Sequence, residues 1–312
     1  MARGTLQSRL TLGAVFVGVF VSAAPSAADP VGPHAAGPAA ERAAPPDPEK
    51  SSRDLRWNDR WARVRALEYA ATLTFGVGAL AATKIPVINR GWDRNAVDEA
   101  VRDGLRLKDA DARSTARDVS DGIFYGMLAF PFVDDLVALP RSRDVTWQLL
   151  MISGESMAVS GLTSVLTERT TGRERPFVRE CAKDPRSYKG CADHDEKYQS
   201  FVGGHTLMSF TTAGLTCANH GHVPLYGGGA ADIAVCAVAV SAASAEPFLR
   251  LAADHHYASD LVLGASLGFA SGYGLPMLLH YGRDAASTRI ASSTVLPYAR
   301  GSELGLRAVG QF

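Results

Sequence analysis

Apolar residues gather in six stretches of the chain that are each long enough to form a helix. Gly272, Gly274 and Pro276 interrupt the last stretch, and we expect that helix to break or kink there, because proline removes a backbone donor. The six stretches cover residues 64–82, 120–139, 147–167, 205–219, 230–250 and 257–281. The pattern predicts an all-α fold, a helical bundle of about six core helices.

Two parts of the chain outside these stretches have patterns of their own. Residues 89–121 are charged and mostly helix-compatible, which indicates amphipathic helices on the surface. The tail of residues 286–312 contains two short alternating runs about Arg300, Gly301 and Ser302, which favours a short C-terminal β-hairpin. A single hairpin cannot close a barrel, so we expect the tail to pack or dock.

The N-terminus has the pattern of an export signal. Basic residues precede an apolar run over residues 10–21, and small residues close the segment 1–28. The run is shorter than the ~20 residues that a permanent membrane anchor needs, so we expect a cleaved signal peptide. Residues 29–52 are rich in Pro and Ala and predict a disordered linker. The helical domain is then expected over residues 53–285, followed by the tail.

Composition narrows the range of partners. The chain has 312 residues, with 32 Lys and Arg balanced by 32 Asp and Glu. Because no net charge attracts polyanions, we expect no nucleic-acid partner. The length is ordinary for one helical domain with tails.

An arginine at the end of the fifth stretch, with a histidine and an aspartate at the start of the sixth, suggests chemistry on phosphate. If a helix begins near His256, Asp260 lies one turn further along the same face and can orient the imidazole. The other ring nitrogen is then free to attack an electrophile. Arg250 offers a planar guanidinium that suits phosphate oxygens. A His and an Asp at this spacing are by themselves more often a structural hydrogen bond.

Two upstream segments strengthen the functional interpretation. Segments 168–176 and 200–206 precede segment 249–260. In order and spacing, the three segments resemble the signature of the type 2 phosphatidic acid phosphatase and vanadium haloperoxidase superfamily, which reads K-x6-R-P, P-S-G-H and S-R-x5-H-x3-D. The resemblance covers residues 147–281 and favours the phosphatase branch. It implies that the three segments meet at one end of the bundle.

The resemblance also implies a role for each matching residue. Arg175 and Arg250 would hold phosphate oxygens, and His256 would be the nucleophile that forms a phosphohistidine. Asp260 would orient His256, and His205 would protonate the leaving alcohol. Backbone N–H groups at the start of the fourth helix, those of Gly203 and Gly204, would bind a further oxygen.

The chain departs from the family pattern at three positions. Glu168 stands where the family has Lys, Gly203 where it has Ser, and Leu249 where it has the Ser of S-R. An acid at position 168 opposes a phosphate dianion unless it points away or pairs with Arg169 or Arg173. Arg173 is the nearest spare cation that could compensate in the site. The Gly203-Gly204 pair tolerates the positive φ that lets backbone donors converge on an anion.

The other histidines are expected to be structural. His255 projects about 100° around a helix from its neighbour, so we expect a surface or supporting position. His220 and His222 could suggest a metal, but no Cys or carboxylate cluster at ligand spacing accompanies them. We expect neither a metal nor a cofactor.

Four cysteines in an exported chain favour two disulfides. Cys181 and Cys191 bracket a loop beside the motifs, and Cys217 with Cys236 could join the fourth and fifth helices, although four cysteines permit three pairings. The alternative keeps Cys217 and Cys236 as buried free thiols.

Whether the helices cross a bilayer is left open by the sequence. The stretch 261–279 is apolar enough, but each acidic residue in a span costs a few kcal/mol. Such residues are Asp134, Asp135, Glu155, Asp232 and Glu246. If all six helices crossed after a cleaved signal, the active end would face the cytoplasm, which conflicts with disulfides there. We expect export to the bacterial cell envelope, with the domain periplasmic, membrane-associated or integral.

The leading hypothesis is thus a metal-independent acid phosphatase or lipid-phosphate phosphatase. Its partner would be a phosphorylated small molecule or a phospholipid. Two alternatives stay open at this point. The chain could be a catalytically impaired protein that binds phosphate or lipid headgroups, or it could be a vanadium haloperoxidase of the same fold.

Overall fold

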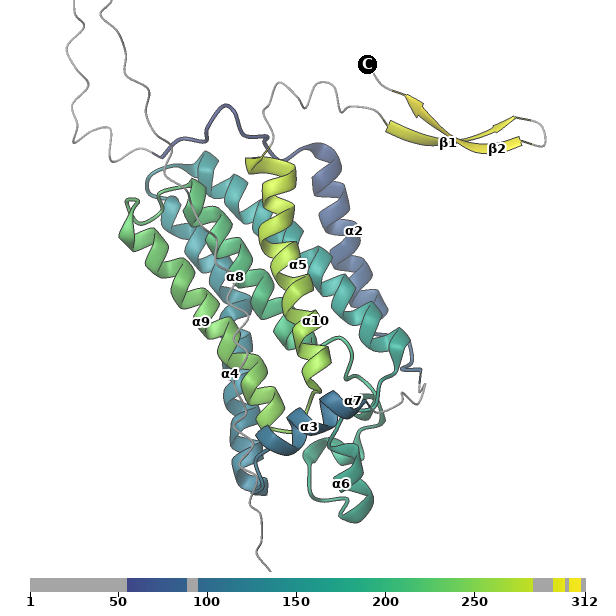
Figure 1. The fold of residues 1–312 in the computed structure, drawn as a ribbon. Helices are drawn as coiled ribbons and strands as arrows, with labels where there is room; N and C mark the ends of the chain where they lie inside the picture. The colour runs from purple at the N-terminus through teal and green to yellow at the C-terminus, as the bar shows by residue number, and fades with distance from the viewer. Residues whose placement is uncertain (1–54, 89–94, 283–293, 301–302, 310–312) are drawn as a thin grey trace, which may run out of the picture. The chain divides into compact units, whose positions relative to one another are not determined.

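The computed structural model describes residues 55–88, 95–282, 294–300 and 303–309; the predicted signal peptide and the predicted linker lie outside this part of the chain. Six long helical elements form the bundle, as the apolar pattern predicts (Figure 1). They are α2 (Ala66–Ala82), α4 (Ala110–Asp135), α5 (Arg143–Thr171), α8 (Gly204–His222), α9 (Ala230–Ala252) and the helix that begins with α10 (Ala258–Phe269).

Helix α8 is the centre of the bundle. It packs against α4, α5, α9 and α10, while α2 covers the outer side of α5. Small and hydroxyl-bearing residues on several faces of α8 are buried, as expected for a helix surrounded by others. Short helices α3 (Ala96–Leu105), α6 (Val178–Lys183) and α7 (His194–Lys197) gather at one end of the bundle, at the bottom of Figure 1.

The packing of α8 against α10 depends on glycine. Gly264, Gly268 and Gly272 recur every four residues and face α8, and a Cβ at Gly268 would overlap the carbonyl oxygen of Leu207. A Cβ at Gly272 would likewise overlap the carbonyl oxygen of Thr211. Only glycine lets two helix backbones approach this closely.

The predicted break at Gly272, Gly274 and Pro276 does not occur. Leu275 and Pro276 keep helical dihedral angles, and the chain continues as two π-helical segments, η3 (Ala270–Gly274) and η4 (Met277–Tyr281). Wider turns accommodate the missing proline donor without ending the helix.

The charged region before the second core helix also differs from the prediction. Helix α4 begins at Ala110, ten residues earlier than the apolar pattern indicates, and the side chain of Asp109 caps it by accepting from Ala112 N at 2.8 Å. Helix α3 does form, but Asp98 and Arg102 on it are buried. Part of the region therefore belongs to the interior and not to a solvated surface, because its charges find partners there.

The acidic residues that argued against membrane contact all point into the bundle. His220 lies between Asp134 and Asp232, with ring nitrogens 2.7 and 2.5 Å from their carboxylates. His280 lies 3.1 Å from Glu155. Asp135 accepts from Ser153 and Asn219, and Glu246 accepts from Thr206 and Arg250. The sequence could not reveal that these carboxylates face inward. Because they are paired inside the bundle, they do not oppose contact of its outer surface with a membrane.

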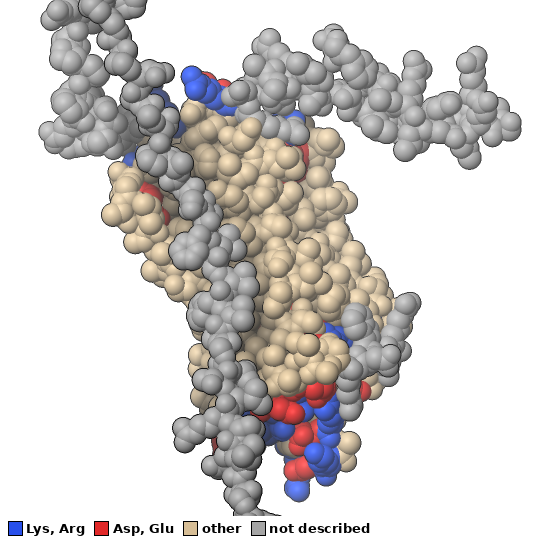
Figure 2. Space-filling view, in the orientation of Figure 1, with Lys and Arg blue, Asp and Glu red and all other residues tan. Residues whose placement is uncertain are grey.

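The outside of the bundle is correspondingly apolar. Figure 2 shows charged side chains concentrated at the end that carries α3 and α6, with few on the middle of the visible face. Exposed large apolar residues include Leu73 and Leu80 on α2, Ile233 and Val238 on α9, and Val262 on α10. Three described helices are long and apolar enough to cross a membrane: α5, α9 and Ala258–Tyr281. This surface suits association with a membrane.

The cysteines pair as the leading expectation has it. Cys181 is bonded to Cys191, which joins α6 to η2 (Lys189–Ala192), and Cys217 is bonded to Cys236, which joins α8 to α9. The alternative of two buried free thiols is therefore wrong.

The tail forms the hairpin that the alternating runs predict. Strands β1 (Thr294–Arg300) and β2 (Glu303–Val309) are antiparallel, with Arg300 opposite Glu303 and Thr294 opposite Val309.

Candidate active site

Backbone hydrogen bonds bring the three motif segments together at the end of the bundle that carries α3. Helix α5 ends at Gly172, whose φ of 59° turns the chain out of the helix. Beyond that turn, Phe177 N donates to Asp254 O at 3.1 Å, which ties the first motif to the third. Gly203 N donates to Asp260 O at 3.2 Å, which ties the second motif to the third. The predicted convergence of the segments is present.

A polar pocket of about 450 Å³ opens at this convergence. Three predicted site residues, Arg175, His205 and Arg250, line it. Arg117, Asp121 and Glu196 are among the residues that complete the wall. Asp121 pairs with Arg250 and Glu196 with Arg117, whereas Arg175 forms no ion pair with the described residues.

His256 is held by one ring nitrogen. Its Nδ1 lies 2.8 Å from the carbonyl oxygen of Ser200 and donates to it, which fixes the tautomer with Nε2 unprotonated. The side chain is buried, and Nε2 has no hydrogen-bond partner in the described part of the chain. Burial, and next the charges of Arg175 and Arg250, hold the pKa of His256 well below its usual range. The ring is therefore neutral, as a nucleophile requires.

The expected direct hydrogen bond from His256 to Asp260 does not form. Asp260 Oδ2 is 4.0 Å from Nδ1 and instead accepts from Ser200 Oγ at 2.7 Å and from Tyr257 N at 2.9 Å. The carboxylate turns toward the start of α10, where it caps unpaired N–H groups. Asp260 thus affects His256 indirectly: it binds the hydroxyl of Ser200, whose carbonyl oxygen orients the imidazole.

Arg173 supports Asp260 and does not supply charge to the pocket. Its NH1 donates to Asp260 Oδ1 and its NH2 donates to Asp98 Oδ2 at 2.7 Å. Asp98, on α3, also accepts from the backbone N and the hydroxyl of Ser259. The expectation that Arg173 compensates for the missing family lysine is wrong, because two buried carboxylates already bind its guanidinium.

The two phosphate-binding candidates have different neighbours. Arg175 NH1 lies 2.8 Å from His255 Nδ1, so His255 takes a buried supporting position and not a surface one. Arg250 donates to Asp121 at 2.5 Å and to Glu246 at 3.2 Å. Burial, and next the charge of Arg250, lower the pKa of Arg175 to about 10. Two buried cations this close favour the binding of an anion.

His205 is paired with Asp121, a residue that the sequence analysis missed. His205 Nε2 lies 3.4 Å from Asp121 Oδ1, and its ring packs on Phe124 with centroids 4.1 Å apart. Burial lowers the pKa of His205 to about 4. Burial opposes ionisation of Asp121 too, but the hydrogen bond from His205 and the charge of Arg250 outweigh it and lower the pKa of Asp121 to about 2.

Glu168 is turned toward the start of α8. Ser164 Oγ donates to its Oε1 at 3.3 Å, and the N–H of Gly204 favours the charged form of the carboxylate. A Cβ at Gly204 would overlap Oε1, so the acid packs directly on the helix start. Arg169 is bound to Asp195 instead. Glu168 therefore pairs with neither Arg169 nor Arg173.

The two glycines of the second motif are already engaged. Glu168 Oε1 packs against Gly204, and the N–H of Gly203 donates to the carbonyl oxygen of Asp260. Gly203 has a φ of −60°, so the positive φ expected of this pair is not used there. The expectation that Gly203 N–H binds phosphate is not supported, because its hydrogen bond holds the second and third motifs together.

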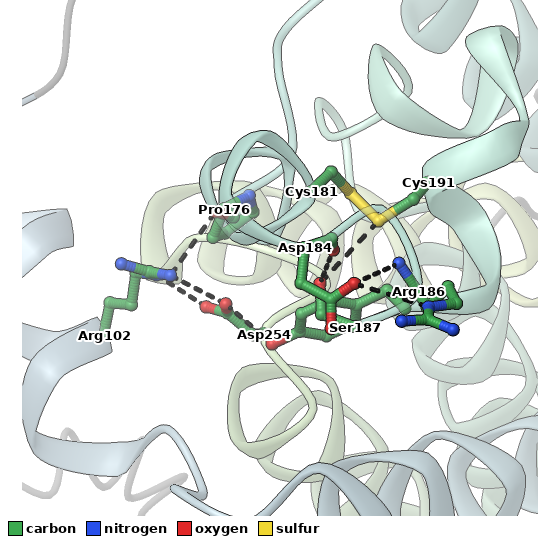
Figure 3. Close-up of a disulfide and its surroundings, with 9 residues drawn as sticks. Arg102, Pro176, Cys181, Asp184, Arg186, Ser187, Cys191 and Asp254 are labelled. Atoms are coloured by element: carbon green, nitrogen blue, oxygen red, sulfur yellow. Dashed lines mark hydrogen bonds and ion pairs between the residues drawn. A yellow bond between two sulfur atoms is a disulfide. The ribbon is translucent and has the colours of Figure 1, made fainter.

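The loop before His255 is fixed from two sides (Figure 3). Arg102 on α3 reaches Asp254 with two hydrogen bonds of 2.6 and 2.7 Å and also the carbonyl oxygen of Pro176. On the other side, the disulfide of Cys181 and Cys191 holds the loop whose Tyr188 donates to Asp254 at 3.1 Å. Asp254 has a φ of 65°, an uncommon conformation that these contacts hold in place.

Metal ligands are not gathered anywhere in the described residues: no group of three or more His, Cys, Asp or Glu suits a metal ion there. His220, one of the two histidines that could suggest a metal, is held between Asp134 and Asp232.

Comparison with known proteins agrees with this geometry. No curated protein and no solved structure matched the chain. The family model described as PAP2 superfamily matches residues 149–283, the segment that carries Arg175, His205, Arg250 and His256. Over this segment, the chain belongs to the PAP2 superfamily.

Proposed function

We propose that the protein is a phosphatase that hydrolyses a phosphate monoester through a phosphohistidine on His256. One observation carries the proposal: His256 is neutral and oriented through Nδ1, while its Nε2 is without a partner among the described residues. Arg175, Arg250 and His205 line the adjoining pocket. A nucleophile, two cations for the phosphate oxygens and an acid are the groups that the reaction needs.

The reaction would proceed in two steps. Nε2 of His256 attacks phosphorus as the bond to the leaving oxygen breaks, and His205 gives that oxygen a proton. A water then attacks phosphorus, His205 takes the proton of the water, and the phosphorus–nitrogen bond breaks to release phosphate. Because the pKa of His205 is about 4 in the free protein, the negative charge of a bound substrate must raise it before His205 can act as the acid.

The surroundings of the site support the finer expectations on substrate and location. An apolar bundle surface suits a protein that meets its substrate at a membrane, so the substrate is a phospholipid or another phosphorylated molecule presented there. Two disulfides suit an exported protein of the cell envelope. No step of the mechanism uses a metal.

The proposal is tested by trapping the intermediate. Protein is mixed with a labelled phosphate monoester in the presence of EDTA and quenched in alkali, in which phosphohistidine is stable. We expect label on the protein and turnover of para-nitrophenyl phosphate, and both should vanish in His256→Ala. His194→Ala is the matched control, because the side chain of His194 is 68% exposed. Turnover by His256→Ala above about a tenth of wild type, a loss of less than about 1.4 kcal/mol, contradicts the nucleophile assignment.

A second candidate is a protein that binds phosphate or a lipid headgroup without turnover. The observation in its favour is that acids already lie at two places expected to bind an anion: Glu168 packs on Gly204 at the start of α8, and Asp121 binds Arg250. Binding of phosphate with neither turnover nor trapped label in the same experiment would favour this candidate.

A further inference from the structure

A carboxylate that the reaction does not use lies at the start of α8, beside the candidate phosphate site. Glu168 Oε1 packs against the backbone of Gly204, where it would overlap an added Cβ, and Arg175 is the strongest positive charge acting on the carboxylate. Both groups are the ones that the motif assigns to a bound phosphate. The side chain thus occupies, from within the protein, a position that an incoming anion would need.

Polar and charged groups from three parts of the chain surround the carboxylate of Glu168. Ser164 and Arg169 belong to its own helix, and Arg169 is bound to Asp195. From outside the helix come Arg175, in the loop after α5, and the N–H of Gly204 on α8. His205, also on α8, directs Nε2 to Asp121.

Burial raises the pKa of Glu168 to about 7, and the opposing attraction of Arg175 does not restore the usual value. The side chain can therefore change charge near neutral pH. When ionised, it competes with a phosphate dianion for Gly204 N–H and Arg175. When protonated, it carries no charge and offers an O–H donor.

We propose that Glu168 is an internal competitor for the phosphate site, and that an anion binds with uptake of a proton by this residue. The inference rests on the proposed function only in naming phosphate as the natural anion. The acid at the position of the family lysine would then restrict the site to acidic and neutral pH. It would not lower the affinity for phosphate equally at every pH.

The sign of the pH dependence follows from linkage. Below the pKa of Glu168 the residue is already neutral, so anion affinity is high and independent of pH. Above that pKa, Glu168 must take up a proton from the solvent when an anion binds. The affinity for the anion therefore falls by up to about tenfold per pH unit.

The test measures binding and not turnover. Tungstate, a tetrahedral dianion that does not titrate over the range, is bound to the full-length protein in a calorimeter from about pH 6.5 to about pH 9. Heats in buffers of different ionisation enthalpy give the number of protons taken up. We expect the dissociation constant to rise along this range for wild type, with proton uptake near one at the alkaline end.

Glu168→Gln keeps the shape of the protonated acid. We expect its tungstate affinity to stay nearly constant with pH and to exceed wild type by up to about 100-fold at about pH 9. Glu196→Gln, which removes another acid of the same pocket, is the matched control: it should shift the affinity at every pH and leave the pH dependence unchanged.

Ser164→Ala provides a second, milder variant in case Glu168→Gln does not fold. The Ser164 hydroxyl stabilises the carboxylate, so its removal raises the pKa of Glu168 and should extend tight binding to higher pH. Wild-type affinity that is constant over the range, or a Glu168→Gln variant that keeps the wild-type slope, overturns the inference. Since no hydrolysis is measured, a protein that binds in this way without turnover would contradict the proposed function alone.

Discussion

At the scale of single residues, the nucleophile candidate is prepared by what surrounds it. The carbonyl oxygen of Ser200 fixes Nδ1 of His256, and Asp260 holds the hydroxyl of the same serine. The orientation of the imidazole therefore depends on a backbone atom, which no side-chain substitution at position 200 removes. Arg175 and Arg250 add positive charge that keeps the ring neutral.

This environment predicts that kcat/KM declines only at a pH below the ordinary pKa of histidine. The ordinary pKa of histidine is 6.5, and burial together with the two arginines places that of His256 well below it. Because the neutral ring is the nucleophile, kcat/KM should not fall as the pH drops through 6.5 and should decline only at more acidic pH. The profile is measured with a soluble phosphate monoester and corrected for titration of the substrate, whose own pKa is about 6.

An acid limb centred near the ordinary histidine value, after that correction, would contradict the buried, neutral state of the nucleophile. His194→Ala serves again as the control, since an exposed histidine should not move the profile.

The motif residues could be predicted from the sequence because their chemistry is encoded in short spacings. Their supporting partners could not. Asp121 lies 129 residues before Arg250, and Asp98 lies 75 residues before Arg173, within a charged region typical of a solvated helix. Only the packing of α3 and α4 on the motif loops turns these acids inward. The capping role of Asp260 was likewise hidden, because the same spacing allows the carboxylate to face either the ring or the helix start.

At the scale of elements, the bundle is organised by the close contact of α8 with α10. The core helices could be predicted from apolar runs, since burial on one face leaves a periodic signal. Gly272 and Gly274 predict a break or kink from the sequence, because spacing alone does not tell whether a neighbouring backbone lies against a glycine. In the structure, Gly268 and Gly272 face the carbonyl groups of α8.

The contact predicts that two glycine substitutions in one helix differ in their effect on stability. Gly268→Ala places a methyl group against Leu207 O and should lower the free energy of unfolding by about 1–3 kcal/mol, because one helix must move. Gly274→Ala is the control, since no atom lies within 4 Å of its added Cβ, and it should change stability by less than about 1 kcal/mol. Thermal unfolding of the two variants in the same buffer makes the comparison. Equal melting temperatures would contradict the close packing of α8 and α10.

At the scale of the whole molecule, two disulfides suit an oxidising compartment and an apolar surface suits contact with a membrane. All four cysteines of the sequence are paired, one pair beside the site and the other between α8 and α9. The five acids that argued against membrane contact are paired inside, and large apolar side chains of α2, α9 and α10 face outward. Neither property could be derived from hydropathy alone, which averages the two faces of each helix.

Export predicts the redox state of the isolated protein. Denatured without reductant, the chain should expose no reactive thiol, and reduction should expose four. A thiol reagent added before and after reduction measures both numbers. Reactive thiols in the unreduced chain would contradict an oxidising location and favour a reducing compartment.

Helices α3 and α4 extend the candidate site beyond the segment that matches the family. Asp98 and Arg102 hold Arg173 and Asp254, and Asp121 on α4 holds Arg250, yet all three lie before residue 149, where the family match begins. A fragment cut at the borders of the family segment would keep every motif residue and lose the side chains that neutralise its buried charges. The candidate site is thus larger than the family segment, because α3 and α4 supply side chains that the motif residues bind.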